Sequence, residues 1–282
     1  MNNIPGPTLA IGLPVFNGAS YISETIDSIL DQTFTDFELI ISDNASIDGT
    51  KNICKQYADK DPRIKYFCNS ENLGINANCK QVLMASRGAK YFMLIGHDDI
   101  LEKRFAEAII ANLENDTKAS IGFCFYEFVD KYSETISYNE YVDKVPDDMR
   151  GMSRLKRLMM QPSSNLIHGV VRCDSLPSDI FDKRYGIYED VLILRYMAGL
   201  GHFNVVPEVL FRKRSHGKNY SSSDVHQKTH QSKDLLEATN RIDSLLDLSV
   251  VEMIGLWLNL NYYFRFKRPF LGHISRIYRA LK

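Results

Sequence analysis

Short apolar runs alternate with segments of helical periodicity over residues 8–130. The runs have strand length and end in polar or glycine-containing turns, whereas the segments between them repeat apolar residues at helical spacing. The pattern predicts strands over 8–13, 37–42, 63–68, 91–95 and 119–129, and helices after Ser20, around 53–57, over 76–86 and from near Leu101. Because strand and helix alternate with short connections, we expect an α/β fold with a mostly parallel sheet.

The pattern is looser after Asp130. Residues 131–150 are polar and aromatic, and we expect them to form a mobile excursion over the crevice at the sheet edge. Further strands are predicted near 166–172 and over 203–212, with helices over 152–160 and 189–199, a flexible loop over 213–224 and helices from 225 onward. The simplest division is one domain over 1–224, with halves at 8–130 and 131–224, followed by a C-terminal helical extension over 225–282.

Composition adds few constraints. The chain has 282 residues, of which 44% are hydrophobic and 24% charged, as in an ordinary soluble protein. Its net charge of -1 gives no reason to expect nucleic acid as a partner. The five scattered cysteines indicate neither a disulfide framework nor a zinc site, which favours a cytoplasmic location. The N-terminus does not resemble a signal peptide, and no apolar run reaches membrane-spanning length.

The C-terminal tail is the exception in charge. Residues 265–282 contain six cationic side chains and no acid, and aromatic residues lie among and before them. Over 256–282 this mixture suits an interfacial helix on the anionic inner face of a membrane, where each cation contributes about 1 kcal/mol. The alternative is a helix that packs on the catalytic body or on a second subunit of a homo-oligomer, with a solvated basic face.

The acid pair Asp98-Asp99 directly follows the apolar run that begins at Tyr91. In an open α/β sheet, ligands bind at the edge where the strands end. Two adjacent carboxylates repel one another there, and a hard divalent cation would relieve the repulsion. The alternative is that the two acids merely cap the helix expected near Leu101.

Other polar side chains follow the ends of the neighbouring strands. Asn17 follows the first strand and Asp43 the second, so parallel strands would bring both to the edge that carries Asp98 and Asp99. The Asp43 carboxylate could accept a base imide proton, and either later acid could bind a ribose hydroxyl or a metal that bridges a diphosphate. No glycine-rich phosphate loop follows the first strand, so carboxylates and a metal would have to hold a nucleotide. Turn formation is the alternative role of these residues.

Four motifs in order carry a resemblance to a known family. They are Leu-Pro-Val-Phe-Asn-Gly over 13–18, Ile-Ser-Asp-Asn-Ala-Ser-Ile-Asp-Gly-Thr over 41–50, Asn-Leu-Gly over 72–74 and Gly-His-Asp-Asp over 96–99. Together they resemble the motifs of family 2 glycosyltransferases over about the first 130 residues. The resemblance implies a GT-A fold, a mostly parallel Rossmann-like sheet flanked by helices. It also implies an inverting reaction, a nucleotide-diphosphate sugar as donor, and usually Mn or Mg.

The resemblance also implies roles for residues of the donor half. Pro14 and Phe16 would line the base pocket, Asp43 would read the base, and Asn17 and Asn72 lie in the matching donor-binding motifs. Asp98 would hold ribose or metal-bound water, and Asp99 would ligate the metal directly. One position departs from the family pattern, because Gly96 stands where the family often has a further acid.

The second half contains softer matches. Glu189-Asp190 is similar to the family motif that begins a helix beneath the acceptor site, which implies that Asp190 is the catalytic base and that Glu189 contacts acceptor or donor sugar. The alternative is that both acids only complement the helix dipole. His216 follows a basic segment that resembles the one approaching the diphosphate or metal, and it is equally a surface-loop residue by composition. His168 lies on the strand expected to line the acceptor pocket, where a core position is the alternative.

The expected function is therefore metal-dependent inverting transfer of a sugar from a nucleotide-diphosphate sugar, with UDP favoured. The acceptor would be a hydroxyl of a saccharide or lipid-linked saccharide in surface polysaccharide or glycan assembly. Two rival classes are a nucleotidyltransferase on a related sheet and a non-catalytic sugar- or partner-binding module. The first lacks its basic glycine-rich loop after the first strand, and Gly96 keeps the second open.

Overall fold

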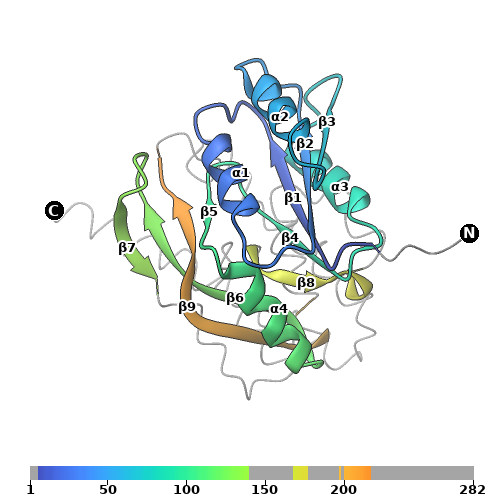
Figure 1. Cartoon of the computed structure of the whole chain (residues 1–282), viewed down its shortest axis with the longest axis vertical. Coiled ribbons are helices and arrows are strands. Elements are labelled where there is room, and N and C mark those ends of the chain that lie inside the picture. The colour runs from blue at the N-terminus through green and yellow to red at the C-terminus, as the bar shows by residue number, and fades with distance from the viewer. Residues whose placement is uncertain (1–5, 140–167, 177–196, 198–199, 217–282) are drawn as a thin grey trace, which may run out of the picture.

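The computed structural model of the chain describes residues 6–139, 168–176, 197 and 200–216. In this part of the chain, one mixed sheet carries helices on both faces (Figure 1). Its strands are β1 (Leu9–Val15), β2 (Phe37–Asp43), β3 (Ile64–Cys68), β4 (Tyr91–Leu94), β5 (Ile100–Leu101), β6 (Ala119–Val129), β7 (Thr135–Asn139), β8 (Val170–Arg172) and β9 (His202–Arg214).

The strand order is β3-β2-β1-β4-β8-β6-β9-β5, and β7 pairs with β6 beside this path. Strands β1 to β4 are parallel to one another. Strand β8 is antiparallel to both β4 and β6, so β6 and its parallel neighbour β9 run in the same direction as the first four strands. The carboxyl ends of β1, β2, β3, β4, β6 and β9 therefore meet at one edge of the sheet, which we call the carboxyl edge.

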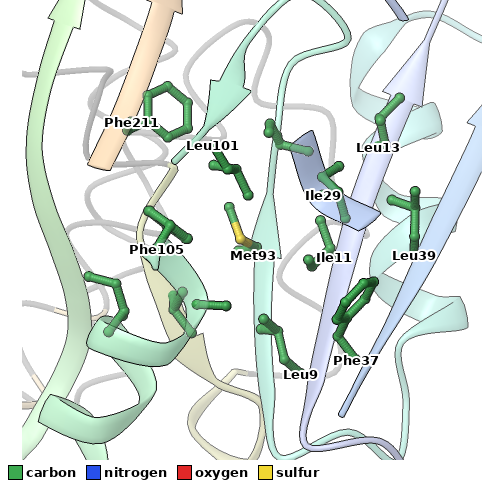
Figure 2. Close-up of a cluster of buried hydrophobic side chains, with 14 of the residues drawn as sticks. Leu9, Ile11, Leu13, Ile29, Phe37, Leu39, Met93, Leu101, Phe105 and Phe211 are labelled. Carbon is green, nitrogen blue, oxygen red and sulfur yellow. The ribbon is translucent and has the colours of Figure 1, made fainter. Parts of the chain in front are cut away.

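Alternation along the strands places an apolar layer on each face. The helices are α1 (Ile22–Leu30), α2 (Thr50–Ala58), α3 (Ile75–Ala85) and α4 (Phe105–Asn115). Leu9, Ile11 and Leu13 of β1 belong to the cluster shared with α1, α2 and α4 (Figure 2). Ala10 belongs to the cluster beneath Val82 of α3. Each fully buried aliphatic side chain contributes about 1.5–3 kcal/mol, so both layers hold the strands in a fixed register.

The predicted strands of the first half are confirmed to within a few residues, but the segment after the acid pair differs. Ile100 and Leu101 form β5, which pairs with β9, and the next helix begins only at Phe105. Asp98 and Asp99 therefore do not cap a helix near Leu101, and that alternative was wrong. The helix expected after Ser20 is α1, and its N-cap is Tyr21, which makes no side-chain capping bond.

The segment expected to form an excursion over 131–150 begins as regular structure. Residues 135–139 form β7, which pairs antiparallel with β6 across a tight turn. The prediction of an excursion was wrong for these residues, because the chain turns back on the end of β6. Among the described residues, no helix is long and apolar enough to cross a membrane.

Candidate active site

Two loops at the carboxyl edge are tied together by Asn17. Its backbone N–H donates to Ser46 Oγ at 2.8 Å, and its side-chain Oδ1 accepts the backbone N–H of Ile47 at 3.0 Å. Asn17 has a φ of 53°, a left-handed conformation that asparagine tolerates better than most residues. The loops after β1 and β2 are thus held as one unit beside the ends of their strands.

Asp43 is the last residue of β2 and is fully buried. Its Oδ1 accepts the backbone N–H of Ser46 at 2.9 Å, and its Oδ2 accepts the hydroxyl of Tyr66 at 3.0 Å. Burial, and then the hydrogen bond to Asp43, raises the pKa of Tyr66, so this hydroxyl remains a donor. Pro14 is partly buried in β1, and the Phe16 ring beside this region is 43% exposed. The edge therefore combines an oriented carboxylate with an accessible aromatic face.

An amide network fixes the loop after β3. Asn44 Nδ2 donates to Asn72 Oδ1 at 2.8 Å, and Asn44 Oδ1 accepts from Asn69 Nδ2 at 3.0 Å and from the backbone of Leu73 at 2.9 Å. Asn69 also donates to Asn78 Oδ1 at 3.1 Å. Buried amide groups lower the free energy only when their donors and acceptors are paired, and here they pair with one another. Asn72 therefore supports the loop after β3 by holding Asn44.

The acid pair lies directly after β4, and its members differ in exposure. Asp99 is 3% exposed, whereas Asp98 is only partly buried. Burial, and then the negative charge of Asp98, raises the pKa of Asp99 to about 7. The backbone N–H of Arg214 donates to Asp99 Oδ1 at 3.0 Å and partly offsets this effect. Burial thus disfavours the charged form of Asp99, and a cation beside it would favour that form.

Gly96 explains how the two carboxylates fit so close to the backbone. A Cβ atom on Gly96 would lie 2.8 Å from Asp98 Oδ1 and 2.8 Å from Asp99 Oδ2. Both carboxylates thus turn toward the glycine, and an acid at this position would push them away. Gly96 stands where the family often has a further acid, and it leaves room for the carboxylates of Asp98 and Asp99.

Two histidines lie against the pair. His216 Nε2 donates to Asp98 Oδ2 at 3.0 Å, and the His216 ring stacks on Tyr21. His168 Nδ1 donates to the carbonyl of Leu94 at 3.2 Å, which leaves Nε2 facing Asp99 Oδ2 at 3.9 Å. Burial lowers the pKa of His168 to about 3, so its ring is neutral and Nε2 carries a lone pair.

The remaining histidine of this loop, His97, points elsewhere. Its ring packs against Gly18, at the approach to α1, so closely that a Cβ on Gly18 would collide with the ring. Its carbonyl accepts the hydroxyl of Thr25 at 2.9 Å. Burial lowers the pKa of His97, although the Asp98 charge opposes this. The His97 ring therefore packs at the approach to α1.

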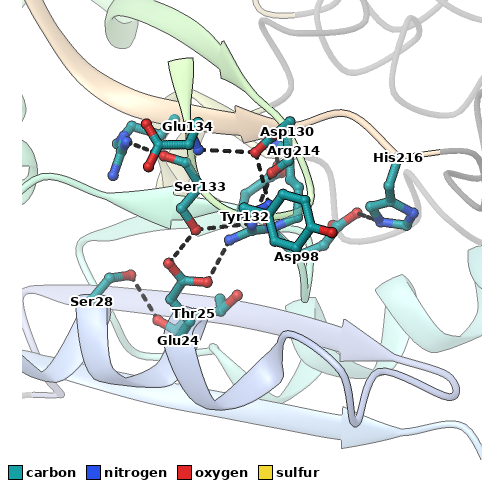
Figure 3. Close-up of polar contacts among 12 residues, drawn as sticks. Glu24, Thr25, Ser28, Asp98, Asp130, Tyr132, Ser133, Glu134, Arg214 and His216 are labelled. Carbon is teal, nitrogen blue, oxygen red and sulfur yellow. Dashed lines mark hydrogen bonds and ion pairs between the residues drawn. The ribbon is translucent and has the colours of Figure 1, made fainter. Parts of the chain in front are cut away.

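Arg214 is a residue whose importance the sequence pattern did not reveal. It is the last residue of β9, and its guanidinium is buried between α1, the acid-pair loop and the β6–β7 turn (Figure 3). Its Nη2 pairs with Glu24 Oε2 at 2.5 Å, and its Nε donates to the carbonyl of Asp98 at 2.9 Å. The basic segment over 212–216 was a visible signal, but Glu24 lies 190 residues away in the chain.

The donor atoms at this edge suit a hard divalent cation. Carboxylate oxygens of Asp98 and Asp99 face the space that a Gly96 side chain would fill, and His216 adds an imidazole. Within the described residues, no group of three or more His, Cys, Asp and Glu side chains is close enough to hold a metal alone. Mg is generally bound in proteins through one or two carboxylates, with substrate phosphates and water as the other ligands.

Some predicted site residues cannot be placed. Glu189 and Asp190 lie outside the described residues, as does the basic tail over 256–282. His168 precedes β8 and lies beside Asp99, so it reaches the same edge as Asp43 and His216. The structure thus brings together the donor-side and metal-side candidates.

Comparisons with known proteins agree with this arrangement. A family model described as glycosyl transferase family 2 matches residues 10–173. An uncharacterized glycosyltransferase of Rickettsia typhi is 32% identical over 191 residues, which cover 67% of this chain and 56% of that relative. The chain thus spans little more than half the length of this relative.

Solved structures show the same fold at low sequence identity. S. aureus TarS 1-349 in complex with UDP-GlcNAc superposes with a TM-score of 0.64 at 17% identity, covering 92% of this chain and 73% of that chain. A second similar structure is the mannosyltransferase PcManGT of Pyrobaculum calidifontis in complex with GDP-Man and Mn2+. It superposes with a TM-score of 0.55 at 14% identity, covering 98% of this chain and 80% of that chain. The mixed sheet with flanking helices is therefore the expected GT-A fold.

Proposed function

This chain belongs to glycosyl transferase family 2, and we propose that it transfers a sugar from a nucleotide-diphosphate sugar to a hydroxyl group of an acceptor. The observation that carries the proposal is the convergence of Asp43, the acid pair and His216 at one sheet edge. The complexes of TarS with UDP-GlcNAc and of PcManGT with GDP-Man support a nucleotide-sugar donor. We favour UDP because a carboxylate such as that of Asp43 accepts a hydrogen bond from the imide of uracil.

Donor binding is assigned to the loops after β1, β2 and β3. Pro14 and Phe16 line the base, and the half-exposed ring of Phe16 supports stacking. Asp43 accepts a hydrogen bond from the N–H of the base. Its carboxylate oxygens have lone pairs that the hydrogen bonds from Ser46 and Tyr66 do not use. Asn17 and Asn72 hold these loops around the nucleotide, a role supported by their bonds to neighbouring loops.

The diphosphate is assigned to the acid-pair side of the same edge. Asp98, Asp99 and His216 would hold Mn or Mg there, and Asp98 would also reach the ribose. A divalent cation supplies charge neutralisation for the diphosphate that leaves. Without it, the negative charge of the acid pair would repel the donor.

The transfer step is assigned to the second half of the chain. Asp190 removes the proton of the acceptor hydroxyl, and the oxygen of that hydroxyl attacks the anomeric carbon of the donor sugar. The bond from that carbon to the diphosphate oxygen breaks on the opposite face, and the configuration inverts. Glu189 and His168 lie on the acceptor side in this proposal, and the short distance from His168 to Asp99 supports a place near the reacting sugar.

The acceptor and the cellular context are further parts of the proposal. A saccharide or lipid-linked saccharide in surface polysaccharide or glycan assembly would suit a protein that meets the membrane through its basic tail over 256–282. A tail that instead packs on a second copy would make a homo-oligomer. Vesicle binding with and without this tail distinguishes the two arrangements.

The test begins with nucleotide sugars and Mn²⁺. A donor that binds the folded state raises the thermal midpoint, and sugar transfer to a saccharide acceptor should follow with that donor. Asp190→Asn should abolish transfer while it keeps metal-dependent nucleotide binding. Transfer at the parent rate by this variant would refute the assigned base.

The same assays separate the rival classes. Release of pyrophosphate from a nucleoside triphosphate would identify a nucleotidyltransferase. Binding without transfer or hydrolysis of any donor in the presence of Mn²⁺ would identify a non-catalytic module. Either result would overturn the proposed function.

A further inference from the structure

Arg214 places a positive charge out of water at the carboxyl edge. Its side chain is 1% exposed, and Nη1 donates to the carbonyl of Asp130 and to Ser133 Oγ, both at 3.0 Å. Nη2 pairs with Glu24 (Figure 3). The guanidinium lies 4.7 Å from the ring centre of Tyr21. A buried guanidinium is tolerated only when a carboxylate and several acceptors satisfy it. The network therefore fixes the end of β9 to α1 and to the β6–β7 turn.

The same residue holds both members of the acid pair through different atoms. Nε donates to the backbone carbonyl of Asp98 at 2.9 Å, which fixes the chain at that position. The backbone N–H of Arg214 donates to Asp99 Oδ1 at 3.0 Å, which fixes the rotation of that carboxylate. His216, two residues further along, donates to Asp98 Oδ2. The orientation of the acid pair is therefore set largely from the end of β9.

A direct role in phosphate binding does not fit this geometry. The guanidinium donors are directed at Asp130, Ser133 and Glu24, and the side chain is almost inaccessible to solvent. To reach a diphosphate, Arg214 would have to give up this network and its ion pair. The arginine can act on a cation only through the carboxylates that it holds.

We propose that Arg214 is a positioning residue for the cation and diphosphate site, through its contacts with Asp98 and Asp99 and its anchorage to Glu24. The inference rests on the proposed function, since it assigns Arg214 to the metal side of that site. A lysine keeps the charge but has one nitrogen, so it cannot replace the contacts of the planar fork. Arg214→Lys should therefore disturb the acid pair even where the fold persists.

Arg172 on β8 offers a matched control. Its Nε donates to the carbonyl of Ala119 at 3.2 Å, and its Nη1 donates to the hydroxyl of Tyr91 at 3.1 Å. Arg172 pairs with Tyr91, the first residue of β4, whereas the acid pair follows the last residue of that strand. Arg172→Lys therefore makes the same chemical change at the opposite edge, in a network of backbone carbonyls and a hydroxyl.

The experiment measures Mn²⁺ binding to the full chain in the presence of UDP, by electron paramagnetic resonance of free Mn²⁺. Circular dichroism sets a temperature at which the parent and both lysine variants are folded. Arg214→Lys should weaken Mn²⁺ binding about 10–100-fold, the usual effect of losing a residue that orients metal ligands. Arg172→Lys should bind Mn²⁺ as the parent does, although its thermal midpoint falls.

Parent-like Mn²⁺ affinity in Arg214→Lys, or an equal loss in both variants, would overturn the inference and leave Arg214 a structural residue. If Arg214→Lys does not fold, Ser133→Ala removes one acceptor of the guanidinium and the donor to Glu24 Oε1. This milder change should weaken Mn²⁺ binding in the same direction, and unchanged affinity would again refute the role. A parent protein that binds no Mn²⁺ with UDP would instead refute the proposed function itself.

Discussion

Polar groups are paired differently at the two edges of the sheet. At the edge where β4 begins, the donors of Arg172 meet backbone carbonyls and the Tyr91 hydroxyl, and Lys90 pairs with Glu114. At the carboxyl edge, the adjacent acids Asp98 and Asp99 repel one another, and the pKa of Asp99 is raised by burial and by its neighbour. One edge pairs groups of opposite charge and polarity, while the other also places two carboxylates side by side, next to the ion pair of Arg214 with Glu24.

This difference separates stability from function. Complementary groups lower the free energy of the folded state, whereas neighbouring carboxylates in a buried place raise it unless something else compensates. Such an unfavourable arrangement persists where the site has a task, because a ligand supplies the missing charge. At the carboxyl edge, the proposed cation would supply that charge.

Asp98→Asn tests this contrast with the largest expected effect. Transfer activity should fall about 100-fold or more, because the cation loses a carboxylate and the diphosphate loses its charge neutralisation. In the absence of divalent cations the thermal midpoint should rise, since the repulsion between Asp98 and Asp99 is removed. A transfer assay measures the first effect, and calorimetry with and without Mn²⁺ and UDP measures the second.

Asp116→Asn is the control at the opposite edge, where Asp116 Oδ1 accepts the backbone N–H of Lys118. This variant should keep the parent's gain in thermal midpoint on addition of Mn²⁺ and UDP. If Asp98→Asn instead unfolds at a lower temperature than the parent without cation, the acid pair is stabilising and the contrast between the edges fails.

A pair of glycine variants sharpens the contrast at smaller scale. A Cβ on Gly201 would collide with the backbone carbonyl of Lys118, which cannot move away, whereas a Cβ on Gly96 would meet only carboxylate oxygens. Gly201→Ala should therefore lower the free energy of unfolding by about 1–3 kcal/mol and leave Mn²⁺ affinity unchanged. Gly96→Ala should cost less stability and weaken Mn²⁺ binding. Chemical denaturation and Mn²⁺ titration of both variants check this, and an exchange of the two outcomes would contradict it.

The same contrast explains which parts of the structure could be predicted from the sequence. Strands β1 to β4 are apolar runs whose signal lies within a few residues, and the polar residues at their ends indicated the carboxyl edge. By contrast, β5 is a strand of two residues that exists because β9 pairs with it. No local pattern at Ile100 carries that information, so a helix was expected there.

The side-chain networks could not be predicted from the sequence for a similar reason. Asp98 and Asp99 were identified as an acid pair from their position, but their orientation depends on Arg214 and on Gly96. One partner of the buried Arg214 is Glu24, which reaches it from α1. A pairing over 190 residues leaves no periodicity along the chain. The sequence thus predicted the acid pair at the sheet edge but not the residues that fix its orientation.

The last pair of variants concerns the base side of the carboxyl edge, around Asp43. Tyr66→Phe removes the hydroxyl that donates to Asp43 Oδ2, while the backbone N–H of Ser46 still holds Oδ1. A hydrogen bond to a charged group contributes about 1.5–3 kcal/mol, so the free energy of unfolding should fall by a similar amount. UDP should bind less tightly because the Asp43 carboxylate is no longer fixed in rotation.

Tyr57→Phe provides the comparison for this last prediction, since the Tyr57 hydroxyl donates to Asp27 Oδ1 at 2.7 Å between α2 and α1. That bond is exposed to solvent, and neither residue belongs to the proposed base pocket. Its loss should therefore change stability little and leave UDP affinity unchanged. Isothermal titration with UDP separates the two variants. Equal UDP affinity in both would mean that Tyr66 only packs against Asp43, and the base side of the edge would then resemble the opposite edge, where polar contacts serve the fold alone.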